Sequence, residues 1–407
     1  MKSLNKKIFF LLSFLFCVIT LCSCFIFDPT EPSENPEPFS EFVNVIVLTE
    51  FQDAKFLPED LENIEKSLNS DEDISVKQYF DKIGNLEMKS VFVFAESSIK
   101  VSDFKAFGSD SEGLKRQVNF AKELLKNQVI YKDVHKSEIF EGKLDNKKSG
   151  FLDSIIFYIP STITNSNFDI SSSLWPHTIF YSVNIGKFKN LNYKEFIVFP
   201  YKVQLFGDSP RGKNIIYNFS VGIMCHELLH VLGNDIGISD LYYYTDLNTH
   251  PVGLYDVMAY TDYYAPQQLN IYYRSLLGWA TLTELNSDKI KIKKSEPTGI
   301  KFGEKDGEFF LVQYFEKSEI CGTEYDEGIL IYRINTNIKN GNVDKDIGEQ
   351  VFLLRTDKYS VNYNAYNFPA IFITDSTFQD FIYSDGTKAN FEIYIEIDED
   401  NFYIEIL

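Results

Sequence analysis

The side chains best suited to chemistry are two histidines and a glutamate in the run Phe219–Gly233, F-S-V-G-I-M-C-H-E-L-L-H-V-L-G. A run so apolar on all sides predicts a buried helix, where unpartnered imidazoles and carboxylates cost several kcal/mol. His226 and His230 are four residues apart, so they project from one helix face within reach of a single metal ion. Glu227 points roughly 100° away, beside such an ion, where a carboxylate can take a proton from a bound water.

The pattern H-E-x-x-H is the signature of zinc peptidases, although a five-residue match also occurs by chance. The alternative is two buried histidines on a structural helix beside an unrelated glutamate. The apolar surroundings favour the metal interpretation. Gly233 follows the second histidine where a helix that ends in a left-handed turn needs glycine.

Length and charge limit the classes of function. A chain of 407 residues can form two domains, and its net charge of -20 argues against nucleic acid or an anionic membrane surface as the partner of the folded part. The 37 phenylalanines and 25 tyrosines fit a chain rich in sheet.

The N-terminal residues predict export. Three lysines precede the apolar run Ile8–Leu21, which describes a secretory signal at residues 1–24. Leu21-Cys-Ser-Cys24 resembles a bacterial lipobox, in which Cys24 is acylated and becomes the mature N-terminus. Residues 25–41 are rich in proline and glutamate and predict an extended tether. We therefore expect a cell-surface or outer-leaflet lipoprotein of a bacterium, held to the membrane by its lipid anchor; an ordinary signal peptide with incidental cysteines also implies export.

Strands and helices alternate before the metal helix, which indicates an α/β (α+β) domain at residues 42–285 with a mainly parallel or mixed sheet. Strands are predicted at 42–48, 88–95, 154–159 and 195–199, and helices after Pro58, at 75–83 and at 114–125. Residues 286–407 form a β-rich C-terminal domain that we expect to be a sandwich. Its predicted strands are 309–315, 328–334, 351–355 and 370–374, followed by a terminal hairpin of 391–397 and 402–406.

Two cysteines, Cys225 and Cys321, lie beyond the signal. Because Cys225 falls inside the apolar helix, we expect it to be a small buried hydrophobe and predict no disulfide framework.

A catalytic zinc site needs a third protein ligand and an open position. Downstream of the helix the candidates are Asp235, Asp240, Asp246, His250 and Asp256. The residue types alone leave this choice open.

Longer motifs make a resemblance specific. The runs H-E-L-L-H-V-L-G…S-D-L-Y, V-G-L-Y-D-V-M-A and Leu277-Gly-Trp279 resemble the immune inhibitor A family of secreted bacterial zinc peptidases, relatives of the metzincins. The resemblance covers roughly residues 42–335 and is strongest within Gly222–Trp279. It implies a metzincin-like peptidase fold, a catalytic Zn²⁺, structural Ca²⁺ and a polypeptide substrate.

Carried over by motif, His226 and His230 match the two ligand histidines, Glu227 the general base and Asp240 the third ligand. The family usually places that aspartate three residues after the glycine, whereas here Gly233 and Asp240 are seven apart. Asp235 therefore competes for the role. We favour Asp240 because Leu241-Tyr242 preserve its local context, and because Gly237 can take a positive φ in the longer loop.

Further residues are assigned by the resemblance. Met258 matches the methionine turn below the metal. The alternative, a methionine packed in the core, does not compete with this assignment, because the turn is itself a packing arrangement. Tyr260 matches a tyrosine that some metzincins aim at the zinc as a transition-state stabiliser, and is otherwise a surface or cleft aromatic. His177 is implied to lie near the cleft wall. Asp246, Asp256 and Asp262 are the candidate calcium ligands, but they lack a recognisable spacing, so we expect solvated acids.

The sequence thus predicts a zinc metalloendopeptidase that hydrolyses extracellular polypeptides. The alternative is a surface lipoprotein that uses the peptidase fold as a binding or adhesive module. The presence of Glu227 argues against that alternative, since a binder has no need of it. The motif does not exclude a zinc hydrolase with a substrate other than peptide.

Overall fold

The computed structural model of the chain describes most of residues 40–407. The described residues are 40–127, 129–130, 144–164, 169, 171–181, 183–188, 190–208, 214–218, 221–244, 246, 251–259, 266–285, 289–316, 327–355, 370, 372 and 374–407. The chain divides into two compact units. The first contains the described residues up to Gln78 and Leu86–Val231, and the second contains Tyr79–Asn85 and Leu232–Leu407.

The domain limits inferred above, with a boundary at residue 285, stay a prediction. The signal peptide and Cys24 lie outside the described residues. Within the described part of the chain, no helix is long and apolar enough to cross a membrane.

The first unit is built on a mixed sheet. Its described strands number seven, in the order β3-β2-β1-β4-β8-β5, and β9 pairs with β8. β2, β1, β4 and β8 run parallel, whereas β3, β5 and β9 are antiparallel to their neighbours. The bounds are β1 Glu41–Glu50, β2 Glu87–Glu96, β3 Val129–Ile130, β4 Ser154–Thr164, β5 His177–Phe180, β8 Glu195–Asp208 and β9 Asn214–Asn218, with a small ribbon of β6 Gly186–Phe188 and β7 Leu191–Tyr193. The predicted mixed α/β architecture is confirmed.

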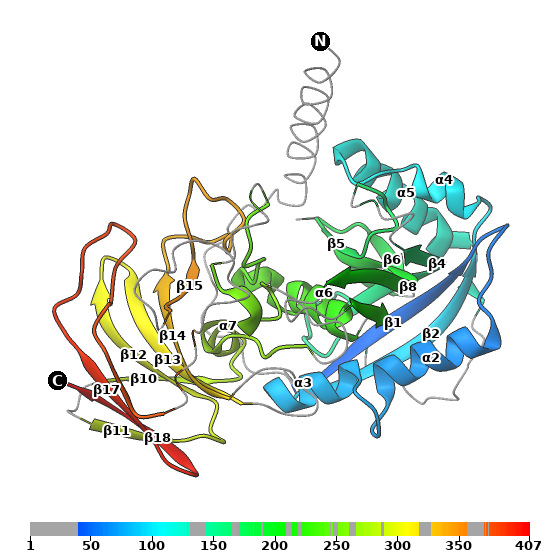
Figure 1. Cartoon of the computed structure of the whole chain (residues 1–407). Coiled ribbons are helices and arrows are strands. Elements are labelled where there is room, and N and C mark those ends of the chain that lie inside the picture. Colours follow the sequence, from blue (N-terminus) through cyan, green and yellow to red (C-terminus); the bar gives the residue numbers. More distant parts are fainter. Residues whose placement is uncertain are drawn as a thin grey trace. The chain divides into compact units, whose positions relative to one another are not determined.

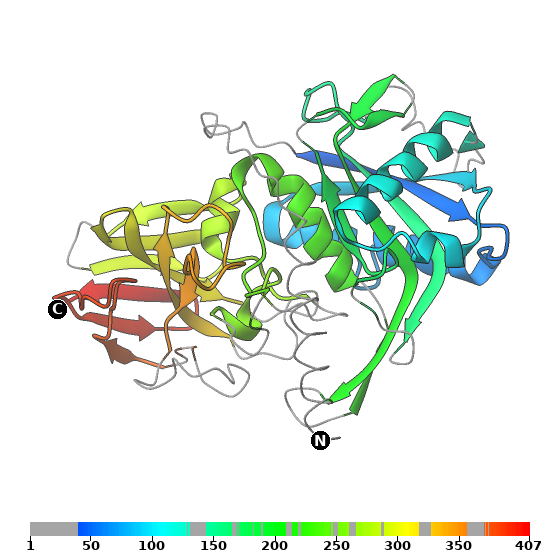
Figure 2. The same ribbon diagram turned by 90° about the horizontal axis from the view of Figure 1, so that it is seen from above.

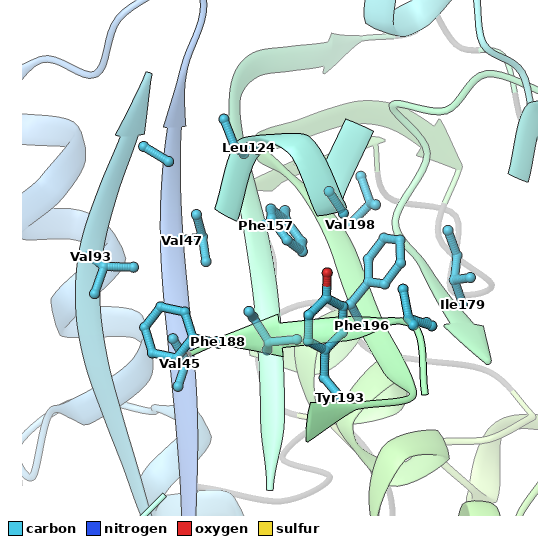
Figure 3. Close-up of a cluster of buried hydrophobic side chains, with 14 of the residues drawn as sticks. Val45, Val47, Val93, Leu124, Phe157, Ile179, Phe188, Tyr193, Phe196 and Val198 are labelled. Atoms are coloured by element: carbon cyan, nitrogen blue, oxygen red, sulfur yellow. The ribbon is translucent and has the colours of Figure 1, made fainter. Parts of the chain in front are cut away.

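Helices cover both faces of this sheet. The interior of β1 is buried throughout, as expected of a central parallel strand. Helix α5 (Ser111–Asn127) lies over one face and α2 (Pro58–Asn69) over the other (Figures 1 and 2). Figure 3 shows the α5 side, where Leu124 faces valines of β1 and β2 and aromatic residues of β4 and β8. Alternating side chains of each strand therefore supply two cores.

The remaining helices of this part of the chain are α3 (Val76–Gly84), α4 (Val101–Lys105) and α6 (Val221–Gly233). Every residue of α6 is buried, as its apolar sequence predicts. The expectation that Gly233 takes a left-handed conformation is wrong, because its φ is -102°. A Cβ at Gly233 would instead lie 2.4 Å from the side chain of Ile238, so close packing requires the glycine.

The second unit is rich in strands. Its described residues form one sheet in the order β10-β12-β13-β14-β15 and another in the order β11-β18-β17-β16. Their bounds are β10 Thr281–Glu284, β11 Lys289–Lys293, β12 Thr298–Lys305, β13 Glu308–Phe315, β14 Gly328–Asn335, β15 Val351–Leu353, β16 Ser376–Phe378, β17 Ile393–Ile397 and β18 Asn401–Ile406. Helix α7 (Ile271–Leu276) and the short 3-10 helices η3 (Asn234–Ile236) and η4 (Gly253–Tyr255) precede them.

The predicted β-rich C-terminal region is confirmed. Ile300 and Phe310 of the first sheet and Ile395 and Phe402 of the second belong to one hydrophobic cluster. The terminal hairpin is present as β17 and β18, whereas the strands β10, β11, β12 and β16 were not predicted. In the predicted strand 370–374, Phe372 forms an isolated bridge with Ile329.

Candidate metal centre

Helix α6 presents the three residues of the H-E-x-x-H pattern. His226, Glu227 and His230 are 9%, 7% and 7% exposed. The two imidazole rings lie edge to face on one side of the helix, with centroids 4.9 Å apart and planes nearly perpendicular. The spacing of four residues thus places both rings where one ion can contact them, as predicted.

Asp240 joins the two histidines. One ligand atom from each of His226, His230 and Asp240 lies within 4.8 Å of the others, and all three residues are buried. In the described part of the chain, this is the one group of three or more histidine, cysteine or acidic residues that could hold a metal ion. Asp235 is exposed on η3 and is not part of the group, and His250 lies outside the described residues.

The segment between Gly233 and Asp240 contains a turn that brings the longer loop back toward helix α6. The N–H of Ile238 donates to the carbonyl of Gly233, which closes a turn after η3. Gly237 has φ 78° and ψ 34°, the left-handed conformation that glycine adopts without steric cost. The positive φ expected at Gly237 is confirmed.

The donor set fits zinc. Two imidazole nitrogens and a carboxylate leave one open position in a tetrahedral site, the arrangement of catalytic zinc centres. Tetrahedral ligand atoms lie roughly 3.3 Å apart around zinc, and the ligand atoms of this group lie within 4.8 Å of one another. Calcium and magnesium prefer oxygen ligands, so the histidines favour a transition metal.

Two hydrogen bonds hold Asp240 itself, and a third holds the next residue, Leu241. The N–H of Asn342 donates to the Asp240 carbonyl at 2.8 Å, and the N–H of Leu241 donates to the carbonyl of Met258 at 2.9 Å. The hydroxyl of Tyr244 donates to Oδ2 of Asp240 at 2.5 Å. The candidate ligand is therefore held by its neighbours along the chain and by distant segments.

Met258 is fully buried, and its position is set by Asp256. Oδ1 of Asp256 accepts the Met258 N–H at 2.6 Å, and Oδ2 accepts the N–H and the Nδ2–H of Asn270, each at 2.7 Å. Because Asp256 is 0% exposed, the expectation of a solvated acid there is wrong. The role of Met258 as a methionine turn stays a prediction.

Glu227 is held from the sheet. The hydroxyl of Thr178, on β5, donates to Oε2 of Glu227 at 2.6 Å, and Thr178 is itself buried. The preceding residue, His177, has Nδ1 2.5 Å from the Trp175 carbonyl and Nε2 3.0 Å from Oε1 of Gln117. Burial lowers the pKa of the His177 imidazole. The edge strand thus orients the carboxylate beside the two histidines.

Other predicted site residues are placed differently or lie outside the description. Asp246 pairs with Lys345 at 2.7 Å, and Asp256 is occupied by the N–H donors described above. Tyr260 and Asp262 fall outside the described residues. Calcium binding and the role of Tyr260 stay predictions. Cys225 is fully buried, as expected of a small core residue.

Three residues that hold the site were not predicted: Thr178, Tyr244 and Asn342. Tyr244 follows Asp240 by four residues in the run D-L-Y-Y-Y, a signal visible in the sequence. Thr178 and Asn342 come from a strand and a loop far from α6 in the chain, so no local pattern marks them.

No protein-family model matches this chain, and no curated protein is significantly similar to it. The evidence for a metal centre is therefore the buried group of His226, His230 and Asp240 itself.

Proposed function

We propose that this chain is a zinc metalloendopeptidase that hydrolyses extracellular polypeptides. The observation that carries the proposal is the buried group of His226, His230 and Asp240 with the Glu227 carboxylate on the same helix. A metal site of purely structural character is usually closed by four protein ligands. Three protein ligands leave a position for water, and an adjacent acid can take a proton from that water, as in catalytic zinc sites.

Each residue has a separate task in this mechanism. His226, His230 and Asp240 would hold the ion, and bound Zn²⁺ supplies the Lewis acidity that polarises a scissile carbonyl and activates water. Glu227 takes a proton from the attacking water and passes it to the leaving amine. Thr178 donates to Oε2 of Glu227, which holds that oxygen and leaves the other to accept the proton.

The proposal also includes the type of peptidase fold, the sandwich of the C-terminal region and the export of the protein. The motifs around α6 support an immune inhibitor A-like peptidase of metzincin type. The buried Met258, whose carbonyl accepts from the N–H of Leu241, supports a methionine turn. The hydrophobic cluster common to both C-terminal sheets supports a sandwich. Cys24 and the lysine-rich leader support an exported protein with an N-terminal lipid anchor, and an exported peptidase would meet its substrate outside the cell.

The test is hydrolysis of a mixed peptide library by the soluble form, residues 40–407, with and without a chelator. A peptidase cleaves the library, loses activity when the chelator removes the metal and regains it when zinc is restored. A Glu227→Gln variant is the matched control, because it keeps the shape of the side chain without the base. Zinc binding with no cleavage of any peptide would instead favour the binding or adhesive module.

A further inference from the structure

The side chain of Tyr244 contacts the candidate ligand Asp240 directly. Its hydroxyl donates to Oδ2 of Asp240 at 2.5 Å, a short bond of the kind that ionised acceptors form. Asp240 is 5% exposed, so the bond lies in a site that water reaches poorly. Hydrogen bonds to a carboxylate are strong in such surroundings.

The position of Tyr244 is fixed by the backbone on both sides of this contact. The Asp240 carbonyl accepts from the N–H of Asn342, and the Tyr244 N–H donates to the carbonyl of Val343 at 3.1 Å. Both ends of the segment are thus attached to the same stretch of chain, residues 342–343. The hydroxyl therefore meets the carboxylate because the loop is anchored on each side of it.

A carboxylate offers a metal two oxygens, and the choice between one and two determines how many positions stay open. A donor on Oδ2 occupies one oxygen and leaves the other for an ion. It also sets the rotation of the carboxylate about its Cβ–Cγ bond. Partners of this kind, one step removed from a metal, orient the ligands and raise metal affinity.

We propose that Tyr244 is a positioning residue of the metal centre: its hydrogen bond restricts Asp240 to a single oxygen ligand and keeps a coordination position open for water. The inference rests on the proposed zinc binding by His226, His230 and Asp240. It assigns Tyr244 a role through Asp240 and not through contact with a substrate.

The experiment compares Tyr244→Phe with Tyr243→Phe in the full-length chain. Tyr243 lies in the same loop and its hydroxyl donates to Glu349, so the control also removes a loop hydrogen bond but none to the ligand. Zinc affinity is measured by competition with a chelator of known strength. We expect Tyr244→Phe to weaken zinc binding by about 10- to 100-fold, and Tyr243→Phe to change it by less than about 3-fold.

Two further measurements separate positioning from a structural role. In an Asp240→Ala background, Tyr244→Phe should produce no further loss of the residual zinc affinity, because the hydroxyl has lost the group through which it acts. In cobalt-substituted protein, the visible spectrum of Tyr244→Phe should show weaker bands than the parent, as added coordination by a second carboxylate oxygen requires.

The outcomes are distinguishable from failure of the proposed function. A parent protein that binds no zinc overturns the function itself. A parent that binds zinc, beside a Tyr244→Phe variant with the same affinity and the same cobalt spectrum, overturns the positioning role alone. A Tyr244→Phe protein that is unfolded without metal would assign the hydroxyl to folding and also overturn it.

Discussion

The N–H of Asn342 donates to the carbonyl oxygen of Asp240 at 2.8 Å, although the two residues are far apart in the sequence. The preceding residue, Gly341, passes so close that a Cβ there would lie 2.3 Å from the same carbonyl oxygen. The Asn342 side chain is fully buried and bonds to both backbone groups of Val351. The strand-rich C-terminal region therefore fixes the backbone of a candidate metal ligand.

This relationship predicts that Gly341→Ala displaces Asp240. The new methyl group would collide with the Asp240 carbonyl, so both the free energy of unfolding and zinc affinity should fall. Gly386→Ala is the matched control, because Gly386 is also left-handed, with φ 82°, but has nothing within 4 Å of its added Cβ. The control should lose about 1–2 kcal/mol of stability through backbone strain and no zinc affinity. Equal zinc affinity in both variants, measured by chelator competition, would contradict the prediction.

Replacing Glu227 with glutamine tests the general base. The amide oxygen of glutamine can still accept the Thr178 hydroxyl, so the variant should keep its fold and its bound zinc. It cannot take a proton from water, so turnover should fall at least ~10²-fold. Zinc content by metal analysis and turnover on a cleaved peptide are measured on the same sample. Undiminished turnover would show that another group is the base.

Thr178 should matter through its hydroxyl. Thr178→Val keeps the shape of the side chain but removes the donor to Glu227, so we expect turnover to fall by about 10-fold or more, the scale of a hydrogen bond to a charged group. Thr178→Ser restores the hydroxyl and should retain most of the activity. If the serine variant were as impaired as the valine variant, packing of the methyl group would explain the loss.

The sequence predicted those parts of the fold and site that depend on local pattern. The apolar run Phe42–Leu48 predicts a strand buried on both faces, and β1 is that strand. The spacing of His226 and His230 predicts one helix face, because helical geometry alone sets it. Gly237 was identified as the reversal point because only the longer loop required one.

Other parts depend on tertiary register, which periodicity does not encode. The sequence predicts Asp256 to be a solvated acid. In the structure it is buried, and it accepts hydrogen bonds from the N–H groups of Met258 and of Asn270, the residue before α7. The sequence predicts Gly233 as a left-handed helix end, yet the glycine is required because the side chain of Ile238 packs where a Cβ would lie. Thr178 meets Glu227 only because β5 pairs at the edge of the sheet beside β8.

The anchor prediction concerns Cys24. Three lysines, an apolar run and Leu21-Cys-Ser-Cys24 favour an acylated N-terminus, and two or more acyl chains give stable membrane attachment. Cys24→Ser should therefore release the protein or leave it mislocalised, as measured by immunoblotting of membrane and soluble fractions. Cys22→Ser is the control and should remain in the membrane fraction. Undiminished membrane retention of Cys24→Ser would exclude this anchor.

The identity of the third ligand is tested by removing the two competing aspartates in turn. Asp240 is buried with the histidines, whereas Asp235 is exposed on η3 and outside the group. Two neutral histidines and one carboxylate around Zn²⁺ leave a site of charge +1, and removing the carboxylate should weaken metal binding strongly. Asp240→Ala is therefore expected to lose zinc and activity, while Asp235→Ala retains most of both.

Metal content of the two purified variants, with their unfolding temperatures after removal of metal, decides between the ligands. Loss of zinc from Asp240→Ala with an unchanged metal-free unfolding temperature assigns the defect to coordination and not to folding. A zinc-replete Asp240→Ala protein beside a zinc-free Asp235→Ala protein would reverse the assignment, because η3 would then have to turn its carboxylate back toward the helix. Two zinc-replete variants would point to His250, the remaining candidate downstream of α6. The third protein ligand would then lie after Tyr244 in the chain.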